Sequence, residues 1–165
     1  MKRSPQLQFV VDRMSPGGIS PEGMLGNDSR PLEDVLDADN STVAGMNLTH
    51  AAIAERLGTM MDIAVAAQGR GVSVGPHLEA CWHEAMGRIP SPWPGEGTFP
   101  KGEMELTDTR AGRTLRVTPL SVHLIAAHGF YQGRGGRYRL EPDELARLLD
   151  LLKERGSIND HTANR

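Results

Sequence analysis

Apolar residues recur at helical spacing in three stretches of the chain. The first stretch covers residues 48–68, where Asn47 or Thr49 can cap a helix and Gly69 can end it. The second covers residues 119–128, which follow Thr118 and are apolar nearly all round, so this helix is predicted to be central. The third begins at Pro142 and is predicted to end at Gly156, with a buried face of Leu145, Leu148, Leu149 and Leu152.

Alternating apolar and polar residues predict strands elsewhere. Residues 103–107 and 113–117 alternate on either side of a DTRAG turn, which is typical of a β-hairpin. Residues 72–86 are ambiguous: one bent strand is favoured because Gly75, Pro76 and Gly87 bracket the run, and a helix over 78–86 is the alternative. Short strands are also expected at residues 6–11 and 138–140, and the Pro- and Gly-rich residues 87–102 are expected to form a structured loop.

These elements predict an α+β fold, in which two or three helices pack on a small, mainly antiparallel sheet. Residues 1–42 carry many Gly, Pro and Ser residues and are expected to form a flexible N-terminal arm. Residues 43–156 are expected to be a single globular domain, and residues 157–165 a disordered tail. The predicted core contains Leu57, Met61, Leu106, Leu115, Val117, Leu124, Ile125, Leu145, Leu148 and Leu149.

The composition is that of an ordinary globular chain of 165 residues, with 38% hydrophobic and 24% charged residues. Cys81 is the single cysteine, so no intramolecular disulfide can form, and a cytoplasmic location is expected. The sequence contains no apolar run long enough to cross a membrane. The net charge of −3 argues against nucleic-acid binding over the whole surface.

The charges are unevenly distributed, because no Asp or Glu lies between Thr109 and Leu140. Such a segment, with its Gly-rich turn, can bind anions through arginines and can stack an aromatic ring on a base. An alternative is that its arginines pair with carboxylates of the last helix while its aromatic residues join the core. The candidate anion-binding residues are Arg113, Arg116, Arg134, Arg137, Arg139 and Tyr131.

Histidine and cysteine residues form a candidate metal site. His123 and His128 lie on one predicted helix, and Cys81 and His83 lie two residues apart, so the four side chains offer nitrogen and sulfur ligands suited to zinc. Residues five apart on an ideal helix point about 140° apart, so a shared ion requires a distorted last turn. Otherwise His128 would stabilise the helix C-terminus and His123 would be a core residue. Pairing of these histidines with Glu103 or Glu105 in catalysis is a further alternative.

Together these features favour a non-catalytic binding or adaptor domain over an enzyme. Its partner would be an acidic protein, a phosphorylated ligand or a nucleic acid, bound by the Arg-rich hairpin and the Gly-Arg loop. The alternative function is a zinc-binding protein or a metal-dependent hydrolase that uses His123 and His128 with Cys81 or His83. A homo-oligomer, associating through the Met60–Met61 helix or the Pro-rich loop, is a third hypothesis.

Overall fold

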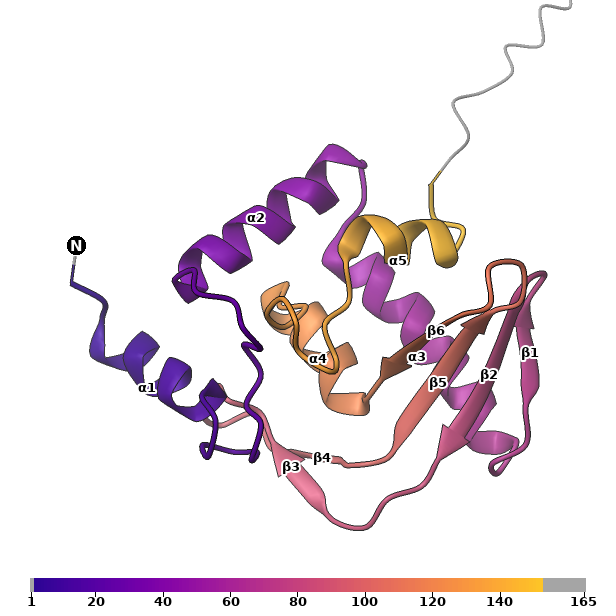
Figure 1. Cartoon of the computed structure of the whole chain (residues 1–165), viewed down its shortest axis with the longest axis horizontal. Coiled ribbons are helices and arrows are strands. Elements are labelled where there is room, and N and C mark those ends of the chain that lie inside the picture. The colour runs from indigo at the N-terminus through magenta and orange to yellow at the C-terminus, as the bar shows by residue number, and fades with distance from the viewer. Residues whose placement is uncertain (1, 153–165) are drawn as a thin grey trace, which may run out of the picture.

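A computed structural model describes residues 2–152 of the chain (Figure 1). Its helices are α1 (Pro5–Met14), α2 (Leu32–Gly45), α3 (His50–Ala66), α4 (Pro119–His128) and α5 (Pro142–Leu148). Its strands are β1 (Val72–Gly75), β2 (Leu78–His83), β3 (Arg88–Pro90), β4 (Thr98–Pro100), β5 (Glu103–Asp108) and β6 (Arg113–Val117). The α+β class predicted from the sequence is therefore confirmed, with more helices than expected.

The main sheet is antiparallel and has the strand order β1-β2-β5-β6, while β3 and β4 form a separate hairpin. Met104 pairs with Val117 and Leu106 with Leu115, which confirms the predicted hairpin and its apolar face. Residues 72–83 form two paired strands rather than one bent strand, because the chain turns between Gly75 and Leu78. The helix alternative for residues 78–86 is wrong, since β2 occupies most of that stretch.

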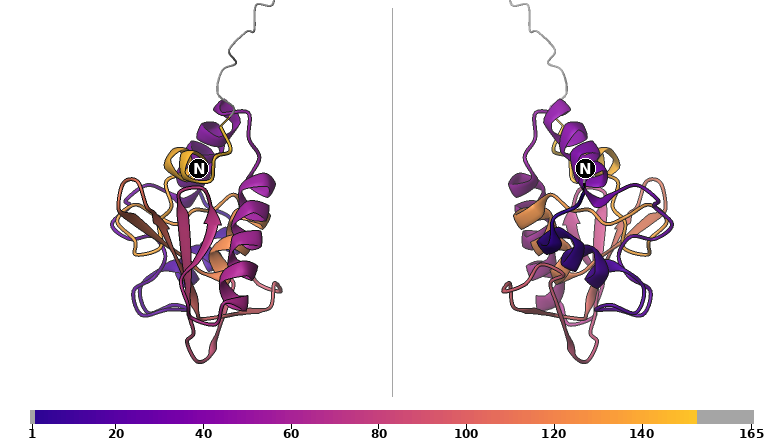
Figure 2. Two further views of the ribbon diagram at one scale, coloured as in Figure 1. Left: turned by 90° about the vertical axis from the view of Figure 1, so that its right-hand side faces the viewer. Right: turned by 90° about the vertical axis from the view of Figure 1, so that its left-hand side faces the viewer.

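Helix α3 covers one face of the main sheet (Figure 2). Its residues Ile53, Leu57 and Met61 are buried with Leu106 and Val117 of the sheet in one apolar cluster. Helix α4 packs beside α3 and is buried on two sides, because Ile125 belongs to this cluster and Leu124 to a second one. Helix α4 is apolar on all sides because it is central in the fold, as the sequence predicted. The predicted core residues are all buried, except Leu115 and Leu148, which are partly buried.

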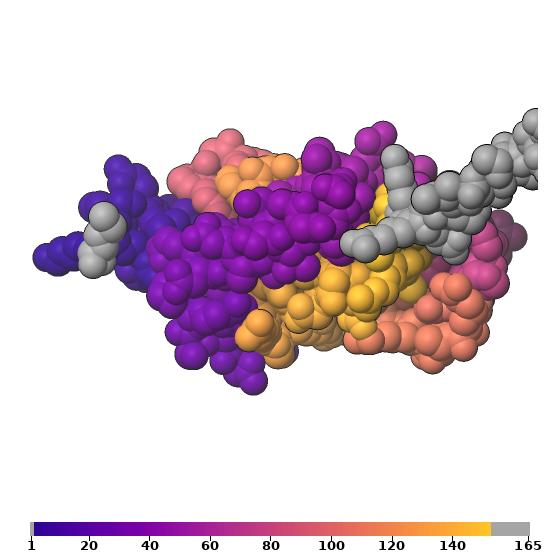
Figure 3. Space-filling view, turned by 90° about the horizontal axis from the view of Figure 1, so that it is seen from above, coloured from indigo at the N-terminus to yellow at the C-terminus, as the bar shows by residue number. Residues whose placement is uncertain are grey.

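The second apolar cluster joins the N-terminal residues to α4. Val10 and Met14 of α1 and Val35 of α2 are buried there against Leu124 and Phe130. Helix α2 also lies alongside α5 (Figure 3). The flexible arm expected over residues 1–42 is therefore only weakly supported. The expected strand at residues 6–11 is wrong, because Ser4 caps α1 by accepting a hydrogen bond from the Leu7 amide at 3.2 Å.

Two further expectations concern the C-terminal part. Residues 138–140 form no strand; Leu140 donates one backbone hydrogen bond to Tyr131, and no ladder follows from it. Helix α5 ends at Leu148, so the predicted continuation of this helix toward Gly156 is wrong over residues 149–152. Gly156 itself and the tail at 157–165 lie outside the described residues. The division into arm, single domain and tail stays a prediction. Among residues 2–152, no helix has the length and apolar character that a bilayer crossing requires.

Candidate metal centre

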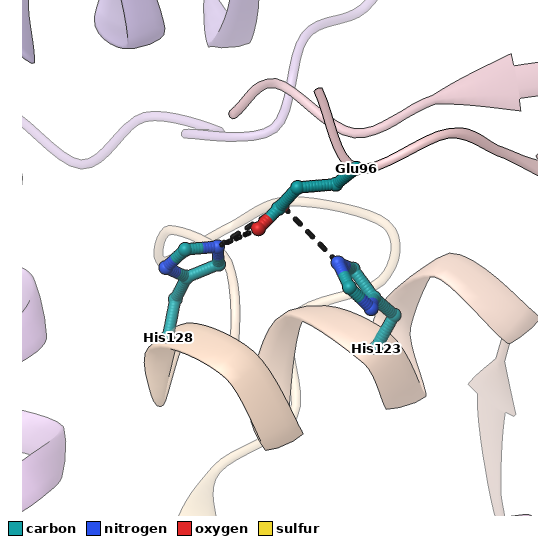
Figure 4. A group of neighbouring side chains, drawn as sticks. All are labelled: Glu96, His123 and His128. Atoms are coloured by element: carbon teal, nitrogen blue, oxygen red, sulfur yellow. Dashed lines mark hydrogen bonds and ion pairs between the residues drawn. The ribbon is translucent and has the colours of Figure 1, made fainter. Parts of the chain in front are cut away.

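The side chains of Glu96, His123 and His128 converge between the β3–β4 hairpin and α4 (Figure 4). One ligand atom from each residue lies within 4.8 Å of the other two. His123 Nε2 lies 3.1 Å from Glu96 Oε1, and His128 Nε2 lies 2.8 Å from Oε2. Among residues 2–152, this is the one group of three or more His, Cys, Asp or Glu side chains with that spacing.

A short loop between β3 and β4 positions the carboxylate. Gly95 and Gly97 flank Glu96 with φ of 80° and 79°, a backbone region that favours glycine, so the chain can double back at this point. Ser91 Oγ donates to Glu96 Oε1 at 2.6 Å and also accepts from the Trp93 amide at 3.1 Å. These contacts hold the carboxylate toward α4.

Arg13 of α1 fastens the base of this loop. Its Nη2 donates to the carbonyl of Ser91 at 2.7 Å, and its Nε donates to the carbonyl of Pro92 at 3.0 Å. Two bonds from one planar guanidinium fix orientation as well as distance. The N-terminal helix therefore supports the site, although none of its residues is a candidate ligand.

Helix α4 supplies both histidines. Thr118 caps its first turn by accepting from the Ser121 amide at 3.0 Å, and Gly129 ends it in the left-handed conformation with φ of 60°. The imidazoles of His123 and His128 both face Glu96 (Figure 4), with ring centroids 6.4 Å apart and ring planes at 80° to each other. They reach one carboxylate because Glu96 lies between them.

Aromatic rings restrict both imidazoles. Trp93 stacks on His128 with ring centroids 3.7 Å apart and planes 9° from parallel. Phe99 of β4 lies against His123 with a centroid distance of 4.6 Å. Such contacts limit ring rotation and hold the nitrogen atoms near the carboxylate.

The site is polar but only partly shielded. The side chains of Glu96, His123 and His128 are 21%, 26% and 22% exposed. Burial raises the pKa of Glu96, but hydrogen bonds from Ser91, His123 and His128 outweigh it, and the net pKa lies below the usual value. The carboxylate is therefore held in its charged form, which a cation requires.

Cys81 and His83 do not join the other two predicted ligands. Both lie on the outer face of β2, where Cys81 Sγ donates to the carbonyl of Gly69 at 3.2 Å and His83 Nε2 lies 3.3 Å from Glu105. Glu103 and Glu105, expected as partners of His123 and His128, contact other groups instead. Glu103 accepts from Tyr138 at 2.8 Å and from Arg116.

Most of the predicted anion-binding arginines are already paired. Arg113 contacts Glu144 of α5, Arg116 contacts Glu103, and Arg137 lies 3.8 Å from Glu103. The alternative of pairing with carboxylates of the last helix thus holds for Arg113. Arg134 has no carboxylate within ion-pair distance in the part of the chain that the structure describes.

Arg139 and Tyr131 are internal rather than surface groups. Arg139 forms a bidentate ion pair with Asp39, and its side chain is only 7% exposed. The Tyr131 hydroxyl lies 2.9 Å from His50 Nδ1, and burial raises the pKa of Tyr131. Neither side chain can contact an external anion without local unfolding.

Glu96 was missed from the sequence alone. It lies 27 residues before His123, in a loop with no regular spacing to α4. The available signal was a single carboxylate between two glycines, in a segment that the sequence predicted to be a structured loop. Comparison of the chain with protein-family models, curated proteins and solved structures found no match, so the interpretation rests on geometry.

Proposed function

We infer that this protein binds a divalent transition-metal ion, preferably Zn²⁺, through Glu96, His123 and His128. The convergence of one carboxylate oxygen and two imidazole nitrogens within 4.8 Å carries this proposal. Two histidines and one carboxylate form a donor set that suits zinc and occurs at catalytic zinc sites. Cys81 and His83, the ligands first considered with the histidines, are not part of it.

The distances support a shared ion. An ion about 2.1 Å from two ligand atoms at a tetrahedral angle separates those atoms by about 3.4 Å. The observed separations between the carboxylate and the nitrogens, 2.8 to 3.1 Å, lie close to that value. Coordination would replace each N–H···O hydrogen bond by bonds from the imidazole nitrogen and the carboxylate to the metal, and the Nε2 proton would move to Nδ1 or be released to solvent.

The partial exposure of the three side chains favours an open coordination position. Structural zinc sites are closed by four protein ligands, whereas catalytic sites have three and leave a position for water. When bound, the ion would lower the pKa of that water and polarise a ligand. Glu96 also lines a groove with α1, Trp93 and Pro94, so a molecule bound in that groove would lie beside the ion.

The surroundings of the ligands resemble a supporting shell. Ser91 holds the carboxylate, and Trp93 and Phe99 hold the imidazoles. Outer contacts of this kind orient ligands, and their loss commonly lowers metal affinity by about 10- to 100-fold. Because most predicted anion-binding arginines are paired or buried, the Arg-rich surface has weaker support than the metal site.

Metal titration tests the proposal. Chelator-treated protein is titrated with Zn²⁺ by calorimetry and with Co²⁺ by visible absorption, which reports coordination geometry. We expect one ion per chain and a higher melting temperature with zinc, because a ligand that binds the folded state stabilises it.

Substitutions distinguish metal binding at this site from metal binding by other side chains. Glu96→Gln and His128→Ala are expected to lower affinity at least about 100-fold, since each removes a ligand. Glu96→Gln keeps the size of the side chain, so a loss of affinity in this variant is not explained by misfolding. His83→Gln and Cys81→Ser are the matched controls and should bind normally. Absence of binding by folded wild-type protein, or binding that survives both ligand substitutions, overturns the proposal.

A further inference from the structure

A second cavity lies apart from the histidines. It has a volume of about 640 Å³ and is bounded by the loop of residues 19–27, by Pro100 at the end of β4 and the following Lys101, and by Gln132 and residues 135–138. None of the three candidate metal ligands lines it. This volume lies in the range of small-molecule sites, roughly 300 to 1,000 Å³.

Gln132 is the unusual residue in the wall of this cavity. It is 6% exposed and adopts a φ of 70°, a left-handed conformation that non-glycine residues rarely occupy. Its side-chain amide makes no hydrogen bond with any other residue in the range 2–152. No buried side-chain nitrogen or oxygen in that range lacks a partner, so the Gln132 amide atoms are accessible to solvent. Because Gln132 lines the cavity and its amide has no protein partner, the amide is free to bind a ligand that enters the cavity.

The conformation of Gln132 is imposed by its neighbours. Arg139 Nη1 donates to the Gln132 carbonyl at 2.8 Å, and the Gly133 amide donates to the Met24 carbonyl at 2.9 Å. On the other side, the Tyr131 carbonyl accepts from the Leu140 amide at 3.2 Å. Backbone strain that is held on every side is typical of a preorganised binding position.

The loop of residues 19–27 packs directly against the loop that contains Gln132. The Asn27 amide donates to the Arg134 carbonyl at 2.9 Å, and a Cβ at Gly26 would collide with the backbone of Arg134 and Gly136. The two loops therefore pack backbone against backbone. A rigid, pre-formed wall reduces the entropy lost when a ligand binds.

Charge at the cavity indicates the kind of ligand. Lys101 and Arg137 contribute positive charge, and Glu22 is the only carboxylate in the lining. Lys101 has no ion pair among residues 2–152, and Arg137 shares Glu103 with Arg116 and Tyr138. Met24, Ile89 and Leu120 make the lining partly apolar.

We propose that this cavity binds a small organic anion, a carboxylate or phosphate attached to an apolar group. Arg137 and Lys101 would bind the anionic group, the Gln132 amide would bind a polar atom, and the apolar lining would contact the remainder. The proposal is independent of the metal site. It also assigns a defined role to one arginine of the Gly-Arg loop.

Nuclear magnetic resonance on ¹⁵N-labelled full-length protein tests the inference. Phenyl phosphate and benzoate are the anionic probes, and benzyl alcohol is the neutral control. We expect saturable shifts of the Gln132 side-chain amide and of the Gly133, Gly135 and Gly136 backbone amides. The two anions distinguish a phosphate site from a carboxylate site, and affinity for the neutral control should be at least about tenfold weaker.

Substitutions identify the groups responsible. Arg137→Ala and Lys101→Ala are each expected to weaken anion binding about tenfold, because each removes a charge-assisted bond. Arg110→Ala, an exposed arginine on the β5–β6 turn, and Glu96→Gln should leave the affinity unchanged. Equal binding of anions and benzyl alcohol, no saturable shift up to about 10 mM probe, or full binding by the Lys101 and Arg137 variants overturns the proposal.

Discussion

Asp39 of α2 and Arg139 form a bidentate ion pair across 100 positions of sequence, at N–O distances of 2.5 and 2.9 Å. Both side chains are less than one-tenth exposed. The same guanidinium also contacts Glu141 and the carbonyl of Gln132. One buried group therefore joins α2, the start of α5 and the loop that borders the second cavity.

Substitution of Asp39 should be strongly destabilising. Asp39→Asn leaves the buried Arg139 with only the half-exposed carboxylate of Glu141 as a counter-charge. Loss of one partner of a buried pair costs about 3 to 5 kcal/mol. The control is Glu33→Gln, which breaks the exposed pair with Arg3 at 3.0 Å and should cost less than about 1 kcal/mol. Urea denaturation measures both, and equal losses would contradict the assigned role of the buried pair.

Helix α1 offers a test of how firmly the N-terminal residues are packed. Met14 is fully buried, so Met14→Ala should lower the free energy of unfolding by about 2 to 5 kcal/mol. Phe9 on the same helix is 50% exposed, and Phe9→Ala should cost less than about 1 kcal/mol. Chemical denaturation distinguishes the two. A flexible arm, as the sequence suggested, would instead make both substitutions nearly neutral.

His50 predicts a pH dependence of stability. Burial lowers the pKa of His50, and the charge of Asp39 opposes this only in part. The ring is held in its neutral form because Nε2 donates to Asn40 Oδ1 at 3.1 Å and Nδ1 accepts from the Tyr131 hydroxyl at 2.9 Å. Protonation would remove the acceptor that the tyrosine uses.

The direction in which stability changes with pH follows from the difference in the His50 pKa between the folded and unfolded chain. The unfolded chain takes up a proton at His50 near pH 6.5, whereas the folded chain does so only at lower pH. The stability contributed by neutral His50 is thus fully present above about pH 6.5 and declines as pH falls toward the lower folded-state pKa. The stability difference between wild type and His50→Gln should shrink over this window. Denaturation from about pH 8 to about pH 5 measures it, and a constant or growing difference would exclude this role.

Elements with strong local signals could be predicted from the sequence. Helix α3 and the β5–β6 hairpin carry regular apolar periodicity, and α4 carries Thr118, Pro119 and Gly129 at its ends. Helix α1 was not predicted because Phe9, Val10 and Val11 favour a strand, although Ser4 and Pro5 are residue types typical of a helix start. Burial against α4 then decides the outcome, and no local pattern reports that contact.

Some residues of the candidate metal site could be predicted from the sequence, and one could not. The sequence placed His123 and His128 on one helix, but their spacing of five residues predicted side chains about 140° apart and so did not favour a shared ion. Glu96 reaches them through a turn that depends on Gly95, Gly97 and the hydrogen bond from Ser91. Such a tertiary arrangement has no fixed sequence spacing, and Cys81 and His83 were therefore considered in its place.

The two hydrogen bonds from Arg13 to the Glu96 loop also define the smallest version of the chain that can be expected to keep the site intact. A shortened chain that starts at residue 43 would retain Glu96, His123 and His128 but lose the group that fastens their loop. It would also expose Leu124 and Phe130, which α1 and α2 cover. Deletion studies that seek a minimal metal-binding fragment should therefore begin before Ser4, because the three candidate ligands and the N-terminal helix form one structural unit.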